Sequence, residues 1–416
     1  MMSRLSMRWR WPVVAVVCLA PLLAQGDDAP HRDFLELAAG WCSGAVRADR
    51  PVARGRLPLG GDRFAGFADF AQDNGDILRA YDPDPRSGAR IYELFNRSER
   101  GLRAALSGRL DADCRAVEGR EIHYLASGRA EAIEHLGANL VRTGRRELLN
   151  PPVPAGSDPG GIRVALVDSG VNYLIPEVAR ALARDEQGRS LGYDFREMDD
   201  RPFDVDPLKR GPFAPVRHGT SVASVLLAHA QGRLSLVPYS FPGNDFRRFR
   251  MLVDDLRRKQ VRIVNMSIGN TDPRGQRNWQ EIVQAMASVP EVLFVLAAGN
   301  EGRDLGDAAA ATSRPANVLV VGAVDASGAV SRLSNHGAGV DVAALADPVA
   351  GRGFDWRPRD LRGTSFAAPQ IVALAAGILQ KEPGLDAMEL KRRICSAATP
   401  VRGEREIACG YIEARL

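Results

Sequence analysis

Short apolar runs recur through the second half of this 416-residue chain, and each run stops at small or polar residues. Runs of this length without alternation are typical of strands that are buried on both faces of a parallel sheet. They lie at 162–167, 261–266, 292–298 and 317–324, with amphipathic segments at 222–230, 246–259 and 279–288. Strands that alternate with helices predict an α/β fold, a doubly wound and mostly parallel sheet with helices on both faces.

A proline- and glycine-rich segment at 151–161 separates this region from the residues before it. Such a segment is typical of a linker, because prolines lack a backbone donor and glycines loosen the chain. We therefore expect a main domain at 162–416 and a smaller N-terminal segment of uncertain fold at 26–150. Within that segment, 131–147 has the composition of a helix. It contains no internal repeat and no catalytic motif, so it is either a pro-segment or an accessory domain.

The first 25 residues have the pattern of a secretory signal peptide. Three arginines precede an apolar run at 11–23, and small or polar residues follow at 24–26. The run is shorter than the roughly 20 apolar residues of a spanning helix, and it contains Pro12 and Pro21. The pattern predicts export to the periplasm or the extracellular space, with no stable membrane span. An uncleaved anchor is the alternative.

Export changes how the cysteines are interpreted. Without the leader, four remain: Cys42, Cys114, Cys395 and Cys409. An even number in an oxidising compartment favours disulfides, and four cysteines allow three pairings. Pairs within each half of the chain, Cys42 with Cys114 and Cys395 with Cys409, are the favoured arrangement. Four buried free thiols are the alternative.

Composition limits the classes of partner. Hydrophobic residues make up 45% and charged residues 25% of the chain, as in ordinary globular proteins, and the net charge is only +4. There is no basic stripe interleaved with aromatics, so we expect no nucleic-acid partner. The acidic run at 199–206 offers oxygen ligands of the kind calcium prefers, but without a regular ligand loop a solvated loop is the favoured interpretation. We therefore expect no metal site and no required cofactor.

Chemically suggestive residues stand where the predicted strands end and where two predicted helices begin. Asp168 follows the first strand, 267–269 follow the second, and Asn300 follows the third. His218 and Ser365 each open a helix of small residues. In doubly wound sheets the working groups gather at the carboxyl ends of the strands, so these residues are expected to converge on one edge.

This set suits nucleophilic catalysis. A serine hydroxyl such as that of Ser365 needs a base within hydrogen-bond reach, and His218 has the right pKa range for that role. Asp168 would hold the second ring nitrogen of the histidine. Asn300 offers a side-chain NH2 group to an oxyanion, beside backbone N–H groups.

The residues around these positions resemble the signature blocks of the subtilisin-like serine proteases. The blocks are VALVDSGV around Asp168, RHGTSVAS around His218, AAGNEG around Asn300 and RGTSFAAPQ around Ser365. They occur in the family's order, and the resemblance spans roughly residues 161–397. It implies a serine endopeptidase that needs no cofactor and acts on polypeptides through an acyl-enzyme.

The resemblance also implies a substrate cleft with two walls. One would be a strand that pairs with the substrate backbone, and the other would face it beside the scissile bond. The candidate wall residues are Ser267, Ile268, Gly269, Ala297, Ala298 and Gly299. The chain departs from the family pattern at Asn270, Gln370, 175–178 and 344–347, which puts calcium sites in doubt and leaves the triad untouched.

Three functional interpretations follow from these residues. The favoured one is an exported serine endopeptidase, with the N-terminal segment blocking the cleft until it is cleaved near the linker. A non-hydrolytic peptide-binding protein on the same fold is the second. The third is an esterase, because an exposed serine nucleophile also attacks esters.

Overall fold

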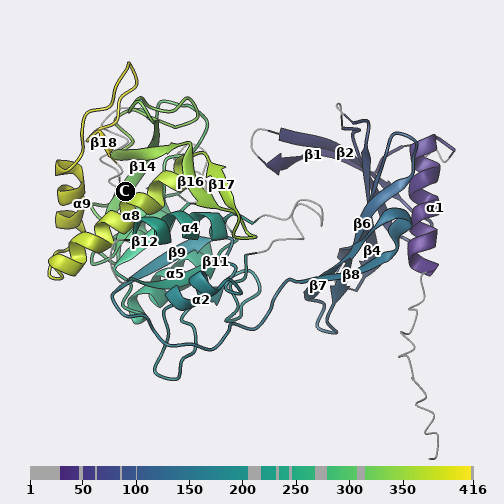
Figure 1. Ribbon diagram of the computed structural model, residues 1–416, viewed down its shortest axis with the longest axis horizontal. Helices are drawn as coiled ribbons and strands as arrows, with labels where there is room; N and C mark the ends of the chain where they lie inside the picture. Colours follow the sequence, from purple (N-terminus) through teal and green to yellow (C-terminus); the bar gives the residue numbers. More distant parts are fainter. Residues whose placement is uncertain are drawn as a thin grey trace, which may run out of the picture.

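The computed structural model describes residues 29–45, 50–60, 63–84, 87–99, 101–204, 217–230, 234–242, 246–267, 279–306 and 314–413. The predicted signal peptide lies outside these residues. The chain forms two parts, an N-terminal one built on an antiparallel sheet and a C-terminal one built on a parallel sheet (Figure 1). Among the helices in the described ranges, none is long and apolar enough to cross a membrane.

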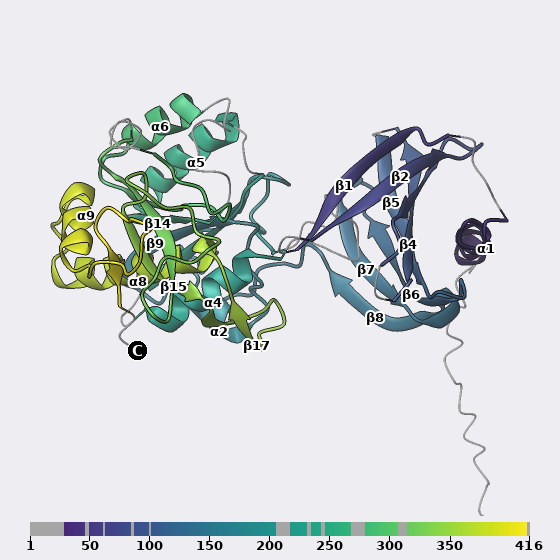
Figure 2. The same ribbon diagram turned by 90° about the horizontal axis from the view of Figure 1, so that it is seen from above.

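The N-terminal part is an eight-stranded meander in which each strand pairs with the next in antiparallel order. Helix α1 (Ala29–Ser43) lies beside this curved sheet (Figure 2). Phe34, Ala38 and Cys42 are buried at helical spacing and pack with Leu78 and Leu106 of the sheet. The strands are β1 (Ala53–Gly60), β2 (Arg63–Ala71), β3 (Ile77–Tyr81), β4 (Arg90–Ser98), β5 (Gly101–Leu110), β6 (Ala116–Tyr124), β7 (Ala130–Leu136) and β8 (Arg142–Leu148).

The helical prediction for 131–147 is wrong. This segment forms β7 and β8, joined by a short 3-10 turn, η1 (Ala138–Leu140). Buried Ile133, Leu136 and Leu140 have a spacing that also fits a helix, but Leu140 is buried by the turn. Pairing of β7 with both β6 and β8 decides the conformation, because local propensity is weak beside tertiary packing.

The C-terminal part contains a parallel sheet in the order β10-β11-β9-β12-β13-β14-β15-β18. In this order β11 lies on one side of β9 and β12 on the other, so the order in which strands are added reverses at β9. Such a reversal opens a crevice at the carboxyl ends of the strands. The strands are β9 (Ile162–Asp168), β10 (Tyr193–Asp194), β11 (Leu234–Ser240), β12 (Ile263–Met266), β13 (Leu293–Ala297), β14 (Val318–Asp325), β15 (Val342–Asp347) and β18 (Tyr411–Ile412). A hairpin of β16 (Val349–Arg352) and β17 (Pro358–Leu361) stands apart from this sheet.

Helices cover both faces of this sheet. Val164 and Leu166 of β9 pack into the core under α4 and α8, whereas Ala165 and Val167 pack into the core under α5 and α6. The prediction of a doubly wound α/β sheet is thereby confirmed. The helices are α2 (Pro176–Ala181), α4 (Gly219–His229), α5 (Phe246–Arg258), α6 (Trp279–Ala287), α8 (Thr364–Lys381) and α9 (Ala387–Ser396).

Two disulfides are present, each within one part of the chain. Cys42 at the end of α1 bonds to Cys114 in the β5–β6 turn, and the two are 72 residues apart in sequence. Cys395 in the last turn of α9 bonds to Cys409 before β18, with a separation of 14 residues. These are the favoured pairs of the three that four cysteines allow.

The two parts are joined by polar contacts as well as by the linker. Asp199 accepts hydrogen bonds from Arg129 at 2.5 Å and from the Asn150 amide at 2.9 Å. Glu147 of β8 forms an ion pair with Arg217, the residue directly before His218. The N-terminal part is therefore held against the chain next to the candidate base.

Candidate active site

Asp168 and His218 meet at the carboxyl end of β9. Asp168 is the last residue of that strand and is fully buried, and His218 directly precedes α4. The Nδ1 atom of His218 lies 2.8 and 3.0 Å from the two carboxylate oxygens of Asp168. Because a carboxylate only accepts, Nδ1 carries a proton and donates it, so Nε2 is the nitrogen that can act as a base.

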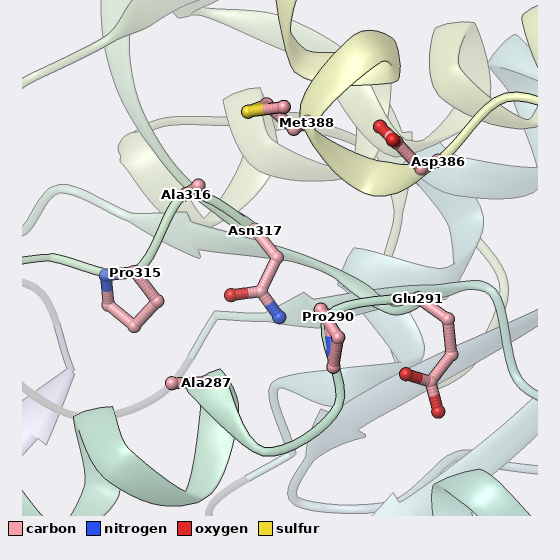
Figure 3. Close-up of a pocket in the computed structure, with 8 residues that line it drawn as sticks. All are labelled: Ala287, Pro290, Glu291, Pro315, Ala316, Asn317, Asp386 and Met388. Atoms are coloured by element: carbon pink, nitrogen blue, oxygen red, sulfur yellow. The ribbon is translucent and has the colours of Figure 1, made fainter.

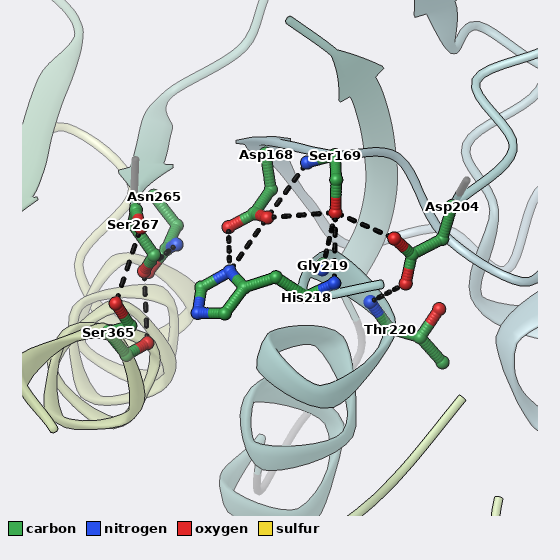
Figure 4. A network of polar contacts seen from close by, with 9 residues as sticks. All are labelled: Asp168, Ser169, Asp204, His218, Gly219, Thr220, Asn265, Ser267 and Ser365. Carbon is green, nitrogen blue, oxygen red and sulfur yellow. Dashed lines mark hydrogen bonds and ion pairs between the residues drawn. The ribbon is translucent and has the colours of Figure 1, made fainter. Parts of the chain in front are cut away.

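Ser365 lies on the Nε2 side of the imidazole, opposite Asp168 (Figure 4). It is the second residue of α8, and its side chain is partly exposed. Its hydroxyl donates to the backbone oxygen of Ser267 at 3.3 Å, and the Ser267 hydroxyl donates to the backbone oxygen of Ser365 at 3.0 Å. These reciprocal bonds tie the start of α8 to the end of β12.

Asn300 stands beside Ser365 with its side-chain oxygen fixed. Its Oδ1 accepts from the Thr364 backbone N–H at 2.9 Å and from the Thr364 hydroxyl at 3.2 Å. With Oδ1 held by Thr364, the side-chain NH2 is left for another acceptor. Gly363 has φ 118°, and a Cβ there would lie 3.0 Å from Asn300 Oδ1. Glycine is thus required for this close approach.

The predicted cleft walls follow β12 and β13, which are neighbours in the sheet. Ser267 ends one wall, whereas Ile268 and Gly269 lie outside the described residues. Residues 297–299 are the other predicted wall. They are braced by the buried amide of Asn335, whose Nδ2 donates to the Ala298 backbone oxygen at 2.9 Å. This edge of the sheet thus carries an imidazole, a hydroxyl and an amide donor.

The model of the subtilase family matches residues 160–411, more than half of the chain. The chain belongs to the subtilase family. This subtilase is 30% identical over 159 residues to alkaline elastase YaB of Bacillus sp. (strain YaB), covering 37% of this chain and 39% of the relative. It is 26% identical over 261 residues to the thermophilic serine proteinase of Bacillus sp. (strain AK1), covering 58% of each.

The chain thus spans about half the length of these curated relatives, from 39% to 58%. Among solved structures, it is similar to a cold-adapted subtilisin-like serine proteinase, with 22% identity and a TM-score of 0.48. That match covers 62% of this subtilase and 91% of the other chain.

Asp204 is a further polar residue at this edge, which the sequence placed only in the acidic run at 199–206. It is fully buried, and it accepts from the Ser169 hydroxyl at 2.6 Å and from the Thr220 backbone N–H at 2.7 Å (Figure 4). Burial raises the pKa of its carboxyl to about 6, although the hydrogen bonds from Ser169 and Thr220 oppose the shift.

The acidic run at 199–206 was expected to be a solvated loop, and for Asp204 that expectation is wrong. Asp204 is buried among hydrogen-bond donors, and Asp199 binds Arg129 and Asn150. Asp206 lies outside the described residues. Within the residues that the structure describes, no group of three or more His, Cys, Asp or Glu side chains is placed to hold a metal ion.

A pocket of about 590 Å³ lies at the opposite edge of the sheet (Figure 3). Its walls come from the segments that lead into β13 and β14, and from the start of α9. The lining residues are Ala287, Pro290, Glu291, Pro315, Ala316, Asn317, Asp386 and Met388. Because it adjoins the amino ends of the strands, this pocket is separate from the site around Asp168.

Proposed function

We propose that this subtilase is a serine endopeptidase in which Ser365 is the nucleophile, His218 the general base and Asp168 the residue that orients the base. The observation that carries the proposal is the Asp168–His218 pairing at 2.8 Å, with Ser365 on the far side of the imidazole. Histidine held in this tautomer presents a lone pair toward the serine, as acyl transfer requires.

The reaction begins when the Ser365 oxygen attacks the scissile carbonyl carbon as its proton moves to His218 Nε2. The carbonyl oxygen becomes an oxyanion, which the Asn300 NH2 and N–H groups in the first turn of α8 stabilise. Breakage of the C–N bond releases the amine, which takes the proton from His218. Water then attacks the acyl-enzyme ester and gives a proton to His218. The C–O bond to Ser365 breaks, the carboxylic acid leaves, and His218 returns the proton to the Ser365 oxygen.

The substrate is proposed to be an extended polypeptide. Ser267 and residues 297–299 lie at the ends of adjacent parallel strands, which supports a cleft in which a peptide backbone pairs with the chain. The same main-chain contacts would also serve a non-hydrolytic peptide binder. Hydrolysis is favoured because a binding protein has no chemical need for the Asp168–His218 pairing beside a serine.

We further propose that the protein is exported, to the periplasm or beyond the cell, and that residues 26–150 restrain the enzyme as a pro-segment. The Glu147–Arg217 ion pair supports this idea, because it attaches the N-terminal sheet next to His218. N-terminal sequencing of the active secreted protein tests it. An active form that begins near residue 25 would instead mark this part as a permanent accessory domain.

The endopeptidase proposal is tested with fluorescein-labelled casein and a simple ester such as p-nitrophenyl acetate. The wild type should cleave casein, and the Ser365→Ala and His218→Ala variants should lose nearly all of this activity. Cleavage of the ester alone would indicate an esterase. Binding of casein without cleavage by the mature wild type would indicate a peptide-binding protein.

A further inference from the structure

We propose that Asp204 is a positioning residue for the reaction of this subtilase, because its carboxylate holds Asp168 and His218 at their working separation. It acts through Ser169, which directly follows Asp168 in the chain, and through Thr220, which is two residues after His218. The inference rests on the proposed function, since a spacing between acid and base matters only if the pair takes part in catalysis.

The Asp204 carboxylate sets the direction of the Ser169 hydroxyl bond. That hydroxyl has one proton and lies 2.6 Å from Asp204 but 3.3 Å from Asp168, so the proton is donated to Asp204. Its lone pairs are then available to the backbone N–H groups of His218 at 3.1 Å and Gly219 at 2.9 Å. The charge on Asp204 thus makes the Ser169 hydroxyl an acceptor for the backbone N–H of His218.

Further bonds orient Asp168 and join the loop after β9 to the start of α4. The Ser169 N–H donates to Asp168 Oδ1 at 2.8 Å, which helps to orient the carboxylate that faces the imidazole. The second oxygen of Asp204 accepts from Thr220, and the Thr220 hydroxyl accepts from the Asn172 N–H at 2.9 Å. The loop after β9 is therefore bound on both sides of Gly170 to the first turn of α4.

The packing around these bonds leaves little room for a compensating shift. A Cβ on Gly219 would lie 2.1 Å from the Gly170 backbone oxygen. Gly170 has φ 96°, and a Cβ there would lie 2.5 Å from the Pro202 backbone oxygen. The backbones at Gly170, Pro202 and Gly219 are thus in close contact. The hydrogen bonds among these segments therefore fix the position of Asp168 relative to His218.

Replacement of Asp204 by asparagine keeps the shape of the side chain but puts a hydrogen-bond donor in place of one accepting oxygen. If the amide nitrogen faces Ser169, the hydroxyl accepts from it and has one lone pair fewer for His218 and Gly219. If the nitrogen faces Thr220, two donors meet in a buried site, which is unfavourable. Either arrangement moves His218 relative to Asp168 while the substrate walls at 267 and 297–299 stay in place.

The test is the rate of inactivation by a fluorophosphonate probe, separated into the maximal rate kinact and the half-saturating concentration KI. For Asp204→Asn we expect kinact to fall about 10- to 100-fold, because small misplacements of catalytic groups have effects of this size, with KI changed less than about twofold. The control is Asp158→Asn at the amino end of the sheet. Like Asp204, Asp158 accepts from a serine hydroxyl and from backbone N–H groups, here from Ser235 at 2.7 Å, Arg184 at 2.8 Å and Gly160 at 2.7 Å.

Ser169→Ala is the second variant, because it removes only a hydroxyl and serves if Asp204→Asn fails to fold. Its loss of kinact should resemble that of Asp204→Asn, and the double variant should lose little more, since both act through one chain of bonds. Wild-type kinact in Ser169→Ala or in folded Asp204→Asn would overturn the inference, as would an equal loss in Asp158→Asn. Failure of the wild type to react at all would overturn the proposed function as well.

Discussion

The orientation of the Asn300 side chain leads to a prediction that separates catalysis from folding. Asn300 has two roles, because its oxygen accepts two bonds from Thr364 and its NH2 is proposed to stabilise the oxyanion. Asn300→Ala removes both groups, so it should lower stability as well as turnover. Asn300→Asp keeps an oxygen for Thr364 and replaces the NH2 by a second acceptor, so it should affect turnover alone.

The expected size of the effect follows from the loss of one donor. Removal of an oxyanion donor typically costs about 100- to 1000-fold in kcat, or about 2.7 to 4 kcal/mol in the transition state. We expect at least this loss for Asn300→Asp, because a carboxylate oxygen near the oxyanion also repels it. KM should stay within about twofold, since the oxyanion forms only during the reaction.

Initial rates over a range of labelled casein concentrations separate kcat from KM, and urea unfolding reports stability. Thr364→Ser is the matched control, because it keeps both the backbone N–H and a hydroxyl for Asn300 and should retain most of the activity. Normal kcat in Asn300→Asp would refute the oxyanion role. A loss that appears only as a higher KM would instead assign Asn300 to substrate binding.

Two further predictions concern stability. Burial raises the pKa of Glu93 from 4.5 to about 7. The protonated carboxyl therefore adds about 3 kcal/mol to the free energy of unfolding below pH 4.5, and this contribution is lost as the pH rises through 7. Urea unfolding from pH 4 to 8 should show this slope in the wild type and a weaker one in Glu93→Gln; equal slopes would contradict it. By the chain-entropy relation, removal of the Cys42–Cys114 bond, which closes 72 residues, should cost about 4 kcal/mol. Removal of the Cys395–Cys409 bond, which closes 14, should cost about 3 kcal/mol, and the reverse order in urea unfolding of the paired Cys→Ser variants would count against this explanation.

The parallel sheet could be predicted because its strands carry their own signal. Strands such as β9 are buried on both faces, so nearly every residue is apolar and the run is visible without knowledge of its neighbours. The strands β7 and β8 carry no such signal. Glu131, Glu134 and Glu147 give this hairpin the composition of a helix, and its strand conformation comes from its pairing with β6.

The same distinction applies to the site. Asp168, His218, Asn300 and Ser365 each follow a strand or open a helix, and the topology of a doubly wound sheet brings such positions to one edge. Asp204 belongs to no regular element, and only the folded chain shows that it lies beside Ser169. Its role depends on a contact between loops, and a contact of that kind leaves no periodic pattern in the sequence.

The most direct test of the central claim is to locate the covalent adduct. Mature wild-type protein is treated with a fluorophosphonate, digested, and analysed by tandem mass spectrometry. We expect one modified residue, Ser365, with no modification in Ser365→Ala and a much slower reaction in His218→Ala. An adduct at another serine such as Ser221, or labelling that persists in Ser365→Ala, would contradict the assignment of the nucleophile.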